Sequence, residues 1–341
     1  MKKLRIMITG GAGFIGSNLA RELVKEGYDV VIVDDFSYAS MFNLMKEGKP
    51  IVDICNVSIC DKRIQELMRG IDIVYHFAAI SCLPVCFNEP AETTRINVAG
   101  TLNVLEAARL NNVKRVVFAS SSAVYENNEK FPSKEEEEIN PHSIYALQKQ
   151  AGELFCKAYR KLYDMDIVIL RFFNVYGPNQ DYTRQKPPVM SYLIKELLQG
   201  KTPVMYGTGE QKRDFIFIDD VTEFNKMLLE REQAKNQTFN VGSGKVYSIN
   251  EIYFGIDGIL QTGIKPIRKS PSEMYEGIEN ITKGKSIKNE IVSHETNKFT
   301  QSDISKAREL LGWEPKTDLK KGLAASVEFV KRMMKTNGNS F

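Results

Sequence analysis

The sequence contains no long apolar run, and no stretch approaches the roughly 18 apolar residues of a membrane-spanning helix. It also lacks a charge imbalance, because 46 basic and 43 acidic residues leave a net charge of only +3. This balance gives no reason to expect a nucleic acid or a membrane surface as a partner. The apolar residues after Met1 are too few for a signal peptide, since Gly10 and Gly11 interrupt them.

Cysteine is scarce, and the odd number of five favours free thiols in a reducing cytoplasm. Cys55 with Cys60 and Cys82 with Cys86 lack the C-x-x-C spacing of a zinc knuckle, so no metal site is expected. Internal repeats and low-complexity tracts are absent as well. A hydrophobic content of 43% and a charged content of 26% are ordinary for a globular chain of about two domains.

The first sixteen residues carry the clearest pattern. A short apolar strand leads into glycines spaced as G-x-x-G-x-x-G, at Gly10, Gly13 and Gly16, and a helix follows. Such glycines permit a tight turn, close backbone approach to a pyrophosphate and close helix packing. A second apolar strand ends at Asp34, 18 residues past Gly16, where a ribose acceptor is expected. The pattern predicts dinucleotide binding; the alternative is a plain βαβ unit with a glycine turn.

Strands alternate with helices through the first half of the chain, which predicts an α/β fold with a Rossmann-like, doubly wound parallel sheet. Further strands are expected at 50–54, 71–79, 113–119, 166–172, 215–218 and 238–241, and long helices at 94–110 and 145–163. We expect a dinucleotide-binding domain at 1–174 with returning segments at about 214–242. A smaller α/β substrate domain is expected at 175–213 and 243–341.

Tyr145 and Lys149 lie four residues apart on the helix expected at 145–163, so their side chains face the same way. Free tyrosine has a pKa near 10, and moving it to about 7 requires roughly 4 kcal/mol. A close ammonium group together with the positive ring of a cofactor is expected to supply this stabilisation. The hydroxyl of Ser121 is then positioned to bridge a substrate and this base.

Together these motifs resemble those of the extended short-chain dehydrogenase/reductase family, in its NAD-dependent nucleotide-sugar epimerase/dehydratase branch. The chain is most similar there to the UDP-glucose and UDP-N-acetylglucosamine 4-epimerases. The resemblance runs nearly end to end and rests on G-G-A-G-F-I-G at 10–16, H-F-A-A at 76–79, N-V-A-G-T at 97–101, S-S-S-A-V-Y at 120–125, Y-A-L-Q-K at 145–149, L-R-F-F-N-V-Y-G-P at 170–178, G-T-G-E-Q-K-R-D-F at 207–215 and D-I-S-K-A at 303–307.

The resemblance implies NAD as the cofactor, and no Arg or Lys closely follows Asp34 to favour NADP. It places Phe14 and Ile15 at the pyrophosphate, Lys149 at the nicotinamide ribose and Tyr145 as the base. The implied cofactor-binding set is Gly10, Gly13, Phe14, Ile15 and Gly16 in the turn, Asp34 and Asp35 after the second strand, Asp53 and Ile54 at adenine, Phe77, Ala78 and Ala79 at the nicotinamide half, and Asn97, Lys149, Phe172 and Val175.

The resemblance also implies a nucleotide sugar, most of all a UDP-sugar, as the substrate. Asn174 and Arg213 are expected at its diphosphate, although Arg213 is alternatively a surface ion pair with Asp214. The ring of Tyr206 is expected to pack against the nucleotide base of the substrate. The remaining implied substrate contacts are Ser122, Val189, Cys82 and Cys86. Relatives commonly form homodimers through the helices at 97–110 and 145–163, and the sequence is compatible with this.

The neighbours of Ser121 favour one reaction. Dehydratases of the family carry an Asp-Glu pair at Ser122-Ala123, and decarboxylases carry a Glu at Ala123; serine and alanine are poor acids. A 4-epimerase, which only removes and returns a hydride, is therefore expected. Departures from the family pattern surround the sugar, at Cys82, Val85, Cys86, Glu126, Ser293 and Thr300. A dehydratase assisted by a cysteine and a catalytically silent NAD-binding scaffold remain alternatives.

Overall fold

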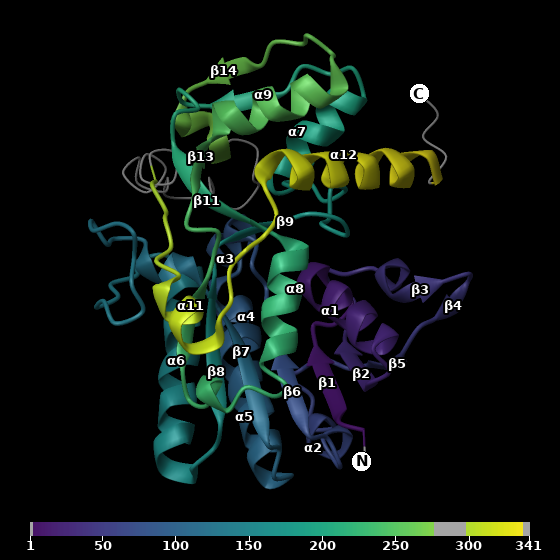
Figure 1. Cartoon of the computed structure of the whole chain (residues 1–341), viewed down its shortest axis with the longest axis vertical. Helices are drawn as coiled ribbons and strands as arrows, with labels where there is room; N and C mark the ends of the chain where they lie inside the picture. The colour runs from purple at the N-terminus through teal and green to yellow at the C-terminus, as the bar shows by residue number, and fades with distance from the viewer. Residues whose placement is uncertain (1–2, 276–297, 337–341) are drawn as a thin grey trace.

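The computed structural model describes residues 3–275 and 298–336, and its centre is a seven-stranded parallel sheet (Figure 1). The strands lie in the order β12-β8-β7-β6-β1-β2-β5. Their bounds are β1 (Arg5–Thr9), β2 (Asp29–Asp34), β5 (Asp53–Asn56), β6 (Ile73–His76), β7 (Arg115–Ser121), β8 (Ile167–Phe172) and β12 (Thr238–Val241). This is the Rossmann-like, doubly wound α/β architecture that the alternating pattern predicts.

One strand begins three residues later than expected. The sequence predicted a strand at 50–54, whereas β5 covers Asp53–Asn56. Pro50 instead ends a short antiparallel hairpin of β3 (Met45–Lys46) and β4 (Lys49–Pro50). Proline has no N–H to donate to an interior ladder, so it is confined to an edge of this kind.

Helices cover both faces of the sheet because alternate residues of each strand point to opposite sides. Ile6 and Ile8 of β1 pack with Leu19 of α1, whereas Met7 packs in a second cluster with Leu105 of α5. Helices α1 and α8 contact each other on the first face, and α2, α5 and α6 lie on the second. The bounds are α1 (Phe14–Lys25), α2 (Ile64–Leu67), α5 (Thr101–Leu110), α6 (Ile144–Tyr163) and α8 (Ile218–Met227).

Short elements join these layers. They are the 3₁₀ turns η1 (Met41–Leu44), η3 (Ser122–Tyr125), η4 (Glu232–Ala234) and η5 (Pro271–Tyr275), the helices α3 (Leu83–Asn88) and α4 (Pro90–Thr94), and the π-helical turn η2 (Arg95–Gly100). Because α4, η2 and α5 follow one another without a break, they bring the loop after β6 close to α6.

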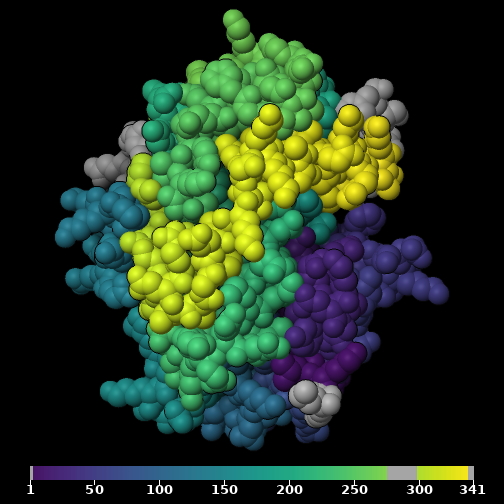
Figure 2. Space-filling view, in the orientation of Figure 1, coloured from purple at the N-terminus to yellow at the C-terminus, as the bar shows by residue number. Residues whose placement is uncertain are grey.

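A second group of elements lies beyond the carboxyl ends of the main strands, at the top of Figure 1. There α7, α9 and α12 pack together, beside a sheet in the order β13-β11-β9 and a strand pair of β10 and β14. In Figure 2 the C-terminal segment, in yellow, crosses the surface from α11 to α12. The bounds are β9 (Asn174–Tyr176), α7 (Val189–Leu198), β10 (Val204–Tyr206), β11 (Lys212–Phe217), β13 (Val246–Ser248), α9 (Ile249–Leu260), β14 (Ile267–Lys269), α11 (Ser305–Leu311) and α12 (Leu319–Thr336).

A buried carboxylate ties residues 298–304, here called the strap, to the main sheet. Asp214 is fully buried and accepts hydrogen bonds from the backbone N–H groups of Ser302 (3.0 Å), Ser243 (2.7 Å) and Gly244 (3.0 Å), and from the hydroxyls of both serines. Burial raises the pKa of Asp214. A surface ion pair between Arg213 and Asp214 is therefore excluded, because this carboxylate faces the interior.

Within the described parts of the chain, no helix is both long enough and apolar enough to cross a bilayer. The same residues contain no group of three or more His, Cys, Asp or Glu side chains placed to hold a metal ion. All five cysteines are free thiols.

Candidate active site

The glycine turn between β1 and α1 is shaped by close backbone contacts. Gly10 has a φ of 68°, and a Cβ there would lie 2.5 Å from the backbone nitrogen of Ala78. A Cβ on Gly16 would lie 2.5 Å from the carbonyl oxygen of Gly10. Any side chain at either position would therefore push the turn away from β6 or the helix away from the turn.

Helix α1 begins without a side-chain cap, because its N-cap residue is Gly13. The carbonyl of Gly13 accepts from the N–H of Ser17 at 3.0 Å, which starts the helix. The N–H groups of Phe14 and Ile15 belong to the first turn, where intrahelical partners are lacking and the helix dipole favours negative charge. A glycine-lined cradle at an uncapped helix end fits the pyrophosphate of a dinucleotide.

The carboxylate of Asp34 lies at the carboxyl end of β2, beside this turn. Its oxygens accept from the N–H groups of Ala12 and Phe36, both at 2.9 Å. Burial raises the pKa of Asp34, and these two hydrogen bonds act against that rise. Each oxygen keeps one further acceptor position, which suits a ribose diol.

Asp35 faces a different set of partners from Asp34. Its carboxylate accepts from the hydroxyl of Ser37 at 2.6 Å and from the N–H of Ser37 at 3.1 Å. Burial alone would raise the pKa of Asp35, but hydrogen bonds from Ser37 and Ser58 lower it. The carboxylate therefore holds its own loop in shape.

The structure does not bring Asp53 and Ile54 to this edge of the sheet. Asp53 is the first residue of β5, and the last residue, Asn56, is the one opposite Asp34. At about 3.3 Å per residue, Asp53 lies roughly 10 Å back from the carboxyl edge. Asn56 and the following Val57 occupy the place that the sequence prediction gave to Asp53 and Ile54, because β5 starts late.

The strand end at 77–79 borders the other half of the cleft. The N–H of Phe77 donates to the carbonyl of Thr9 at 3.0 Å, which continues the pairing of β6 with β1. The ring of Phe77 meets that of Phe172 edge to face, with centroids 6.1 Å apart. Ala78 and Ala79 are half-buried, and so is Val175, the middle residue of β9. These small and apolar groups line the side of the cleft expected to face a flat ring.

Asn97 is buried and acts on the loop after β6. Its Oδ1 accepts from the N–H of Ile80 at 2.8 Å. Both amide hydrogens are also used, because Nδ2 donates to the carbonyl of Ile80 at 2.9 Å and to Oε1 of Gln148 at 2.7 Å. Asn97 therefore joins this loop to α6, the helix that carries Tyr145.

The structure brings Ser121, Tyr145 and Lys149 together. Ser121 Oγ accepts from the N–H of Ala123 at 3.2 Å, and Ser121 lies near enough to the phenol of Tyr145 to act on its pKa. Lys149 is buried; its Nζ donates to the carbonyl of Ala119 at 2.7 Å and lies 5.9 Å from the centre of the Tyr145 ring. A hydroxyl, a phenol and an ammonium group thus meet at the carboxyl end of β7.

The surrounding protein groups alone place the pKa of Tyr145 above its ordinary value. Burial raises this pKa to about 12, and the hydrogen bond with Ser121 opposes the rise. Burial also lowers the pKa of Lys149 to about 8. The ammonium of Lys149 donates to the carbonyl of Ala119, and the predicted lowering of the pKa, which combined this ammonium with the positive ring of a cofactor, stays a prediction.

The two cysteines expected at the sugar occupy different environments. Cys82 is the half-buried N-cap residue of α3. Cys86 is only 1% exposed, and its Sγ donates to the carbonyl of Ile80 at 3.5 Å. Burial raises the pKa of Cys86 to about 11, so this thiol stays protonated near neutral pH.

Glu126 is a functional position whose role the sequence did not indicate. Its carboxylate accepts from the N–H groups of His142 and Ser143, and from the hydroxyl of Ser143 at 2.8 Å. Ser143 in turn caps α6 by accepting from the N–H of Ala146 at 3.4 Å. The helix bearing Tyr145 is therefore anchored to η3, which also carries the half-buried Ser122. Ser143 directly precedes a segment with helical apolar spacing, which is a local signal for a helix cap. No local sequence pattern indicates the role of Glu126.

The residues expected at the diphosphate come from two adjacent strands. Asn174 of β9 lies opposite Phe215 of β11, and its Nδ2 donates to the carbonyl of Asp214 at 2.8 Å. Arg213 precedes Asp214, and its Nη1 donates to the carbonyl of Lys298 at the start of the strap. Asn174 and Arg213 are therefore brought to one region.

Three further expected contacts belong to the upper group of elements and the strap. Val189 begins α7 and Tyr206 ends β10, and both are half-buried. Thr300 of the strap is buried, and its Oγ1 accepts from the N–H of Asp214 at 3.3 Å. Ser293 lies outside the described residues.

Comparison with known proteins gives consistent matches over the whole chain. Residues 6–242 match the NAD dependent epimerase/dehydratase family. A UDP-glucose 4-epimerase of Mycolicibacterium smegmatis is 32% identical over 330 residues, which are 96% of this chain and 98% of that protein. A UDP-N-acetyl-alpha-D-glucosaminuronate decarboxylase of Bacillus cytotoxicus is 31% identical over 342 residues, which are 98% of this chain and 99% of that protein.

A solved structure gives the same result. It is that of a UDP-glucuronic acid 4-epimerase from Bacillus cereus in complex with UDP-glucuronic acid and NAD. Its TM-score is 0.82 at 29% sequence identity, and the match covers 97% of this chain and 100% of that chain. The names of these similar proteins span two reactions, epimerisation and decarboxylation.

Proposed function

Since the chain belongs to the NAD-dependent epimerase/dehydratase family and its cofactor is NAD, we propose that it is a nucleotide-sugar 4-epimerase. The proposed substrate is a UDP-hexose or a UDP-N-acetylhexosamine, oxidised at C4 and then reduced from the opposite face. One observation carries the proposal. Ser121 lies near enough to the phenol of Tyr145 to act on its pKa, Lys149 follows Tyr145 by one helical turn, and the neighbouring Ser122 and Ala123 supply no carboxylic acid.

In this proposal the glycine turn and the N–H groups of Phe14 and Ile15 hold the pyrophosphate of NAD. Asp34 accepts from the adenosine ribose, and Lys149 donates to the nicotinamide ribose. The fit rests on the cradle at Gly10 and on the uncapped start of α1. Bound NAD supplies a hydride acceptor and, when oxidised, a positively charged ring.

The residues of the chain handle the proton. Tyr145 takes the proton of the substrate's 4-hydroxyl as the C4 hydrogen leaves as hydride, and Ser121 bridges the hydroxyl and the phenol. Both the proton and the hydride return to the sugar, so atoms and charge balance over one turnover. From a pKa of about 12, Tyr145 needs roughly 7 kcal/mol of stabilisation of its phenolate to act at pH 7. A positive ring beside a buried phenol acts in that direction.

The carboxylates and thiols around the dyad support epimerisation over elimination. Glu126 is committed to capping α6, so it is not directed at a substrate. Cys86 is protonated, but its thiol is buried against the carbonyl of Ile80. Half-buried Cys82 is the remaining thiol that a cysteine-assisted dehydratase would use. A silent scaffold is disfavoured because Tyr145 and Lys149 are both present.

We also propose a homodimer with α5 and α6 at its interface. Leu147, Leu154 and Leu162 on α6 and Leu110 at the end of α5 are 42–69% exposed. A set of exposed leucines on two neighbouring helices marks a surface suited to a partner helix pair. The free thiols favour a reducing compartment such as the cytoplasm.

The domain division proposed from the sequence remains 1–174 with returning segments at about 214–242, and 175–213 with 243–341. Two observations support the returning segments. Helix α8 packs on α1, and β12 pairs with β8 in the main sheet.

The decisive experiment measures products from a panel of UDP-, dTDP-, GDP- and CDP-sugars by mass spectrometry and NMR. An epimer keeps the mass of its substrate, a dehydratase product lacks one water and a decarboxylase product lacks carbon dioxide. We expect the epimer, and we expect Tyr145→Phe to lose at least about 10³-fold in kcat. Tyr163→Phe, an exposed tyrosine on the same helix, is the matched control. A loss of mass, or a Tyr145→Phe variant with near-normal turnover, would refute the assignment.

A further inference from the structure

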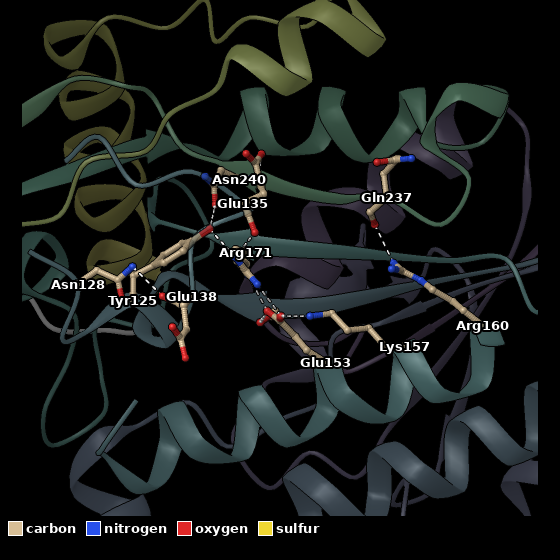
Figure 3. Close-up of polar contacts among 11 residues, drawn as sticks. Tyr125, Asn128, Glu135, Glu138, Glu153, Lys157, Arg160, Arg171, Gln237 and Asn240 are labelled. Carbon is tan, nitrogen blue, oxygen red and sulfur yellow. Dashed lines mark hydrogen bonds and ion pairs between the residues drawn. The ribbon is translucent and has the colours of Figure 1, made fainter. Parts of the chain in front are cut away.

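A buried carboxylate lies directly behind the proposed catalytic residues. Glu153 on α6 is fully buried and accepts from Ser120 Oγ at 2.6 Å and from Nε and Nη2 of Arg171 at 2.9 and 2.8 Å. Ser120 and Arg171 stand opposite each other in the register of β7 and β8. Figure 3 shows Arg171 reaching from β8 to Glu153 on the helix below it.

The partners of Glu153 are direct neighbours of residues in the site. Ser120 precedes Ser121, Arg171 precedes Phe172, and Glu153 follows Lys149 by one helical turn. One carboxylate thus joins the three elements whose spacing sets the distance between the serine hydroxyl and the phenol. We propose that Glu153 is a positioning residue that fixes α6 against β7 and β8, an inference that depends on the proposed function.

The bonding of Arg171 extends beyond Glu153. Its Nη1 donates to the hydroxyl of Tyr125 at 2.6 Å, and that hydroxyl donates to Oδ1 of Asn240 at 2.9 Å. Asn240 Nδ2 then donates to the carbonyl of Asp303 in the strap at 3.1 Å. The network therefore links α6, which carries Tyr145, to the strap, whose Lys298 carbonyl accepts from Arg213.

Stability alone does not account for a charged pair in this place. Glu153 is 0% and Arg171 is 2% exposed, so both groups are desolvated. Replacement of a buried ion pair by well-packed apolar residues is often neutral or stabilising. A pair that only held the fold together would therefore be replaceable without loss of turnover.

Electrostatics gives the carboxylate a second effect. The titratable groups that face Lys149 are His76 of β6, Cys86 of α3, and Tyr145, Glu153 and Cys156 of α6. Burial lowers the pKa of Lys149 to about 8, and Cys86, Cys156 and, least of the three, the negative charge of Glu153 act to raise it. His76, Cys86 and Tyr145 are uncharged near pH 7, because their pKa values are about 3, 11 and 12. Loss of the Glu153 charge is therefore expected to move the pKa of Lys149 below 8.

The test removes the pair without leaving an unpaired charge. The NAD-loaded variant with Glu153→Met and Arg171→Met is compared with the wild type on the UDP-sugar that the wild type epimerises. We expect a folded protein whose kcat is at least about tenfold lower, with KM little changed. We also expect the alkaline limb of kcat to move to lower pH, because the negative charge of Glu153 is one of the groups that raise the pKa of Lys149.

A matched control lies at the opposite ends of the same two strands. Arg115 at the start of β7 and Asp166, the residue before β8, form a largely buried pair with Nε and Oδ2 2.7 Å apart. The variant Arg115→Met with Asp166→Met is expected to keep the kcat and the alkaline limb of the wild type. A Glu153/Arg171 variant with wild-type kcat and pH profile would overturn the proposal, and so would an equal loss in the control.

Two further measurements keep the test decisive if the paired variant fails to fold. Ser120→Ala removes one hydrogen bond and no charge, so kcat should fall several-fold with the alkaline limb unmoved, and Ser120→Thr should restore it. An unchanged kcat in Ser120→Ala would overturn the positioning role.

NMR of [ε-¹³C]lysine holoenzyme, with Lys149→Arg for assignment, measures the pKa of Lys149 directly in the wild type and in Glu153→Gln. If no sugar is turned over, the proposed function fails, and this titration still decides whether Glu153 sustains the charge.

Discussion

The pH dependence of stability should be governed in part by one buried histidine. His76 is 1% exposed; its Nδ1 lies 2.7 Å from Thr9 Oγ1 and its Nε2 lies 2.9 Å from Thr101 Oγ1. Thr101 donates its own proton to the carbonyl of Asn97 at 2.7 Å, so it accepts from Nε2–H. Nδ1 must then accept from Thr9, and a proton added at Nδ1 would meet another donor.

The magnitude follows from the pKa. Burial lowers the pKa of His76 to about 3, whereas an unfolded histidine titrates near 6.5. Below pH 6.5 the unfolded chain therefore takes up a proton that the folded chain does not, and stability falls as the pH falls, until the folded pKa is reached. At about 1.4 kcal/mol per pH unit, the contribution lost between pH 7 and pH 5 is about 2 kcal/mol.

Urea unfolding at pH 5, 6 and 7, with NAD saturating, measures this loss. His76→Gln removes the titrating group, so its free energy of unfolding should fall by about 2 kcal/mol less than that of the wild type between pH 7 and pH 5. Asp34, Glu135 and Asp214 have raised pKa values and act in the opposite sense, but they are common to both proteins. His142→Gln, at an exposed position, should keep the wild-type slope. An unchanged slope in His76→Gln would refute the reasoning.

Two further outcomes concern the cofactor and the assembly. Asp34→Ala should weaken NAD binding roughly 10- to 100-fold in calorimetry, because it removes the proposed charged acceptor of the ribose. Asp35→Ala, which loses contacts within its own loop, should weaken NAD binding less. Equal effects of the two substitutions would contradict the assignment of Asp34. Leu154→Glu on the outer face of α6 should convert the proposed dimer to a monomer in light scattering. Phe254→Glu on α9, where the side chain is 65% exposed, should leave the dimer intact. A monomeric wild type would refute the dimer proposal.

The parts of the fold that the sequence predicted well are those with local causes. The helix expected at 145–163 is α6 (Ile144–Tyr163), since Ser143 supplies a cap and the apolar spacing is regular. The glycine turn required by Gly10 was likewise predictable, because its positive φ leaves few alternatives. The late start of β5 was missed because an apolar run around Pro50 resembles a strand although proline belongs to a hairpin edge.

The parts that were missed depend on partners distant in the sequence. Glu126 meets Ser143 and Glu153 meets Arg171, and each pair is 17 or 18 residues apart with no shared motif. The pKa of Tyr145 was expected to fall from the combined effect of Lys149 on the same helix and the positive ring of a cofactor. Spacing on a helix fixes the side that a residue faces, but it does not reveal burial or that the ammonium donates to Ala119.

The position of β12 has a consequence for how the protein is made. This edge strand pairs with β8, yet 65 residues separate its start from the end of β8 at Phe172. On a translating ribosome the six buried residues of β8 therefore emerge long before the strand that covers their open edge. We expect a fragment ended at residue 174, the end of the first segment of the proposed cofactor-binding domain, to aggregate. We expect expression trials to succeed only when the chain extends past Val241.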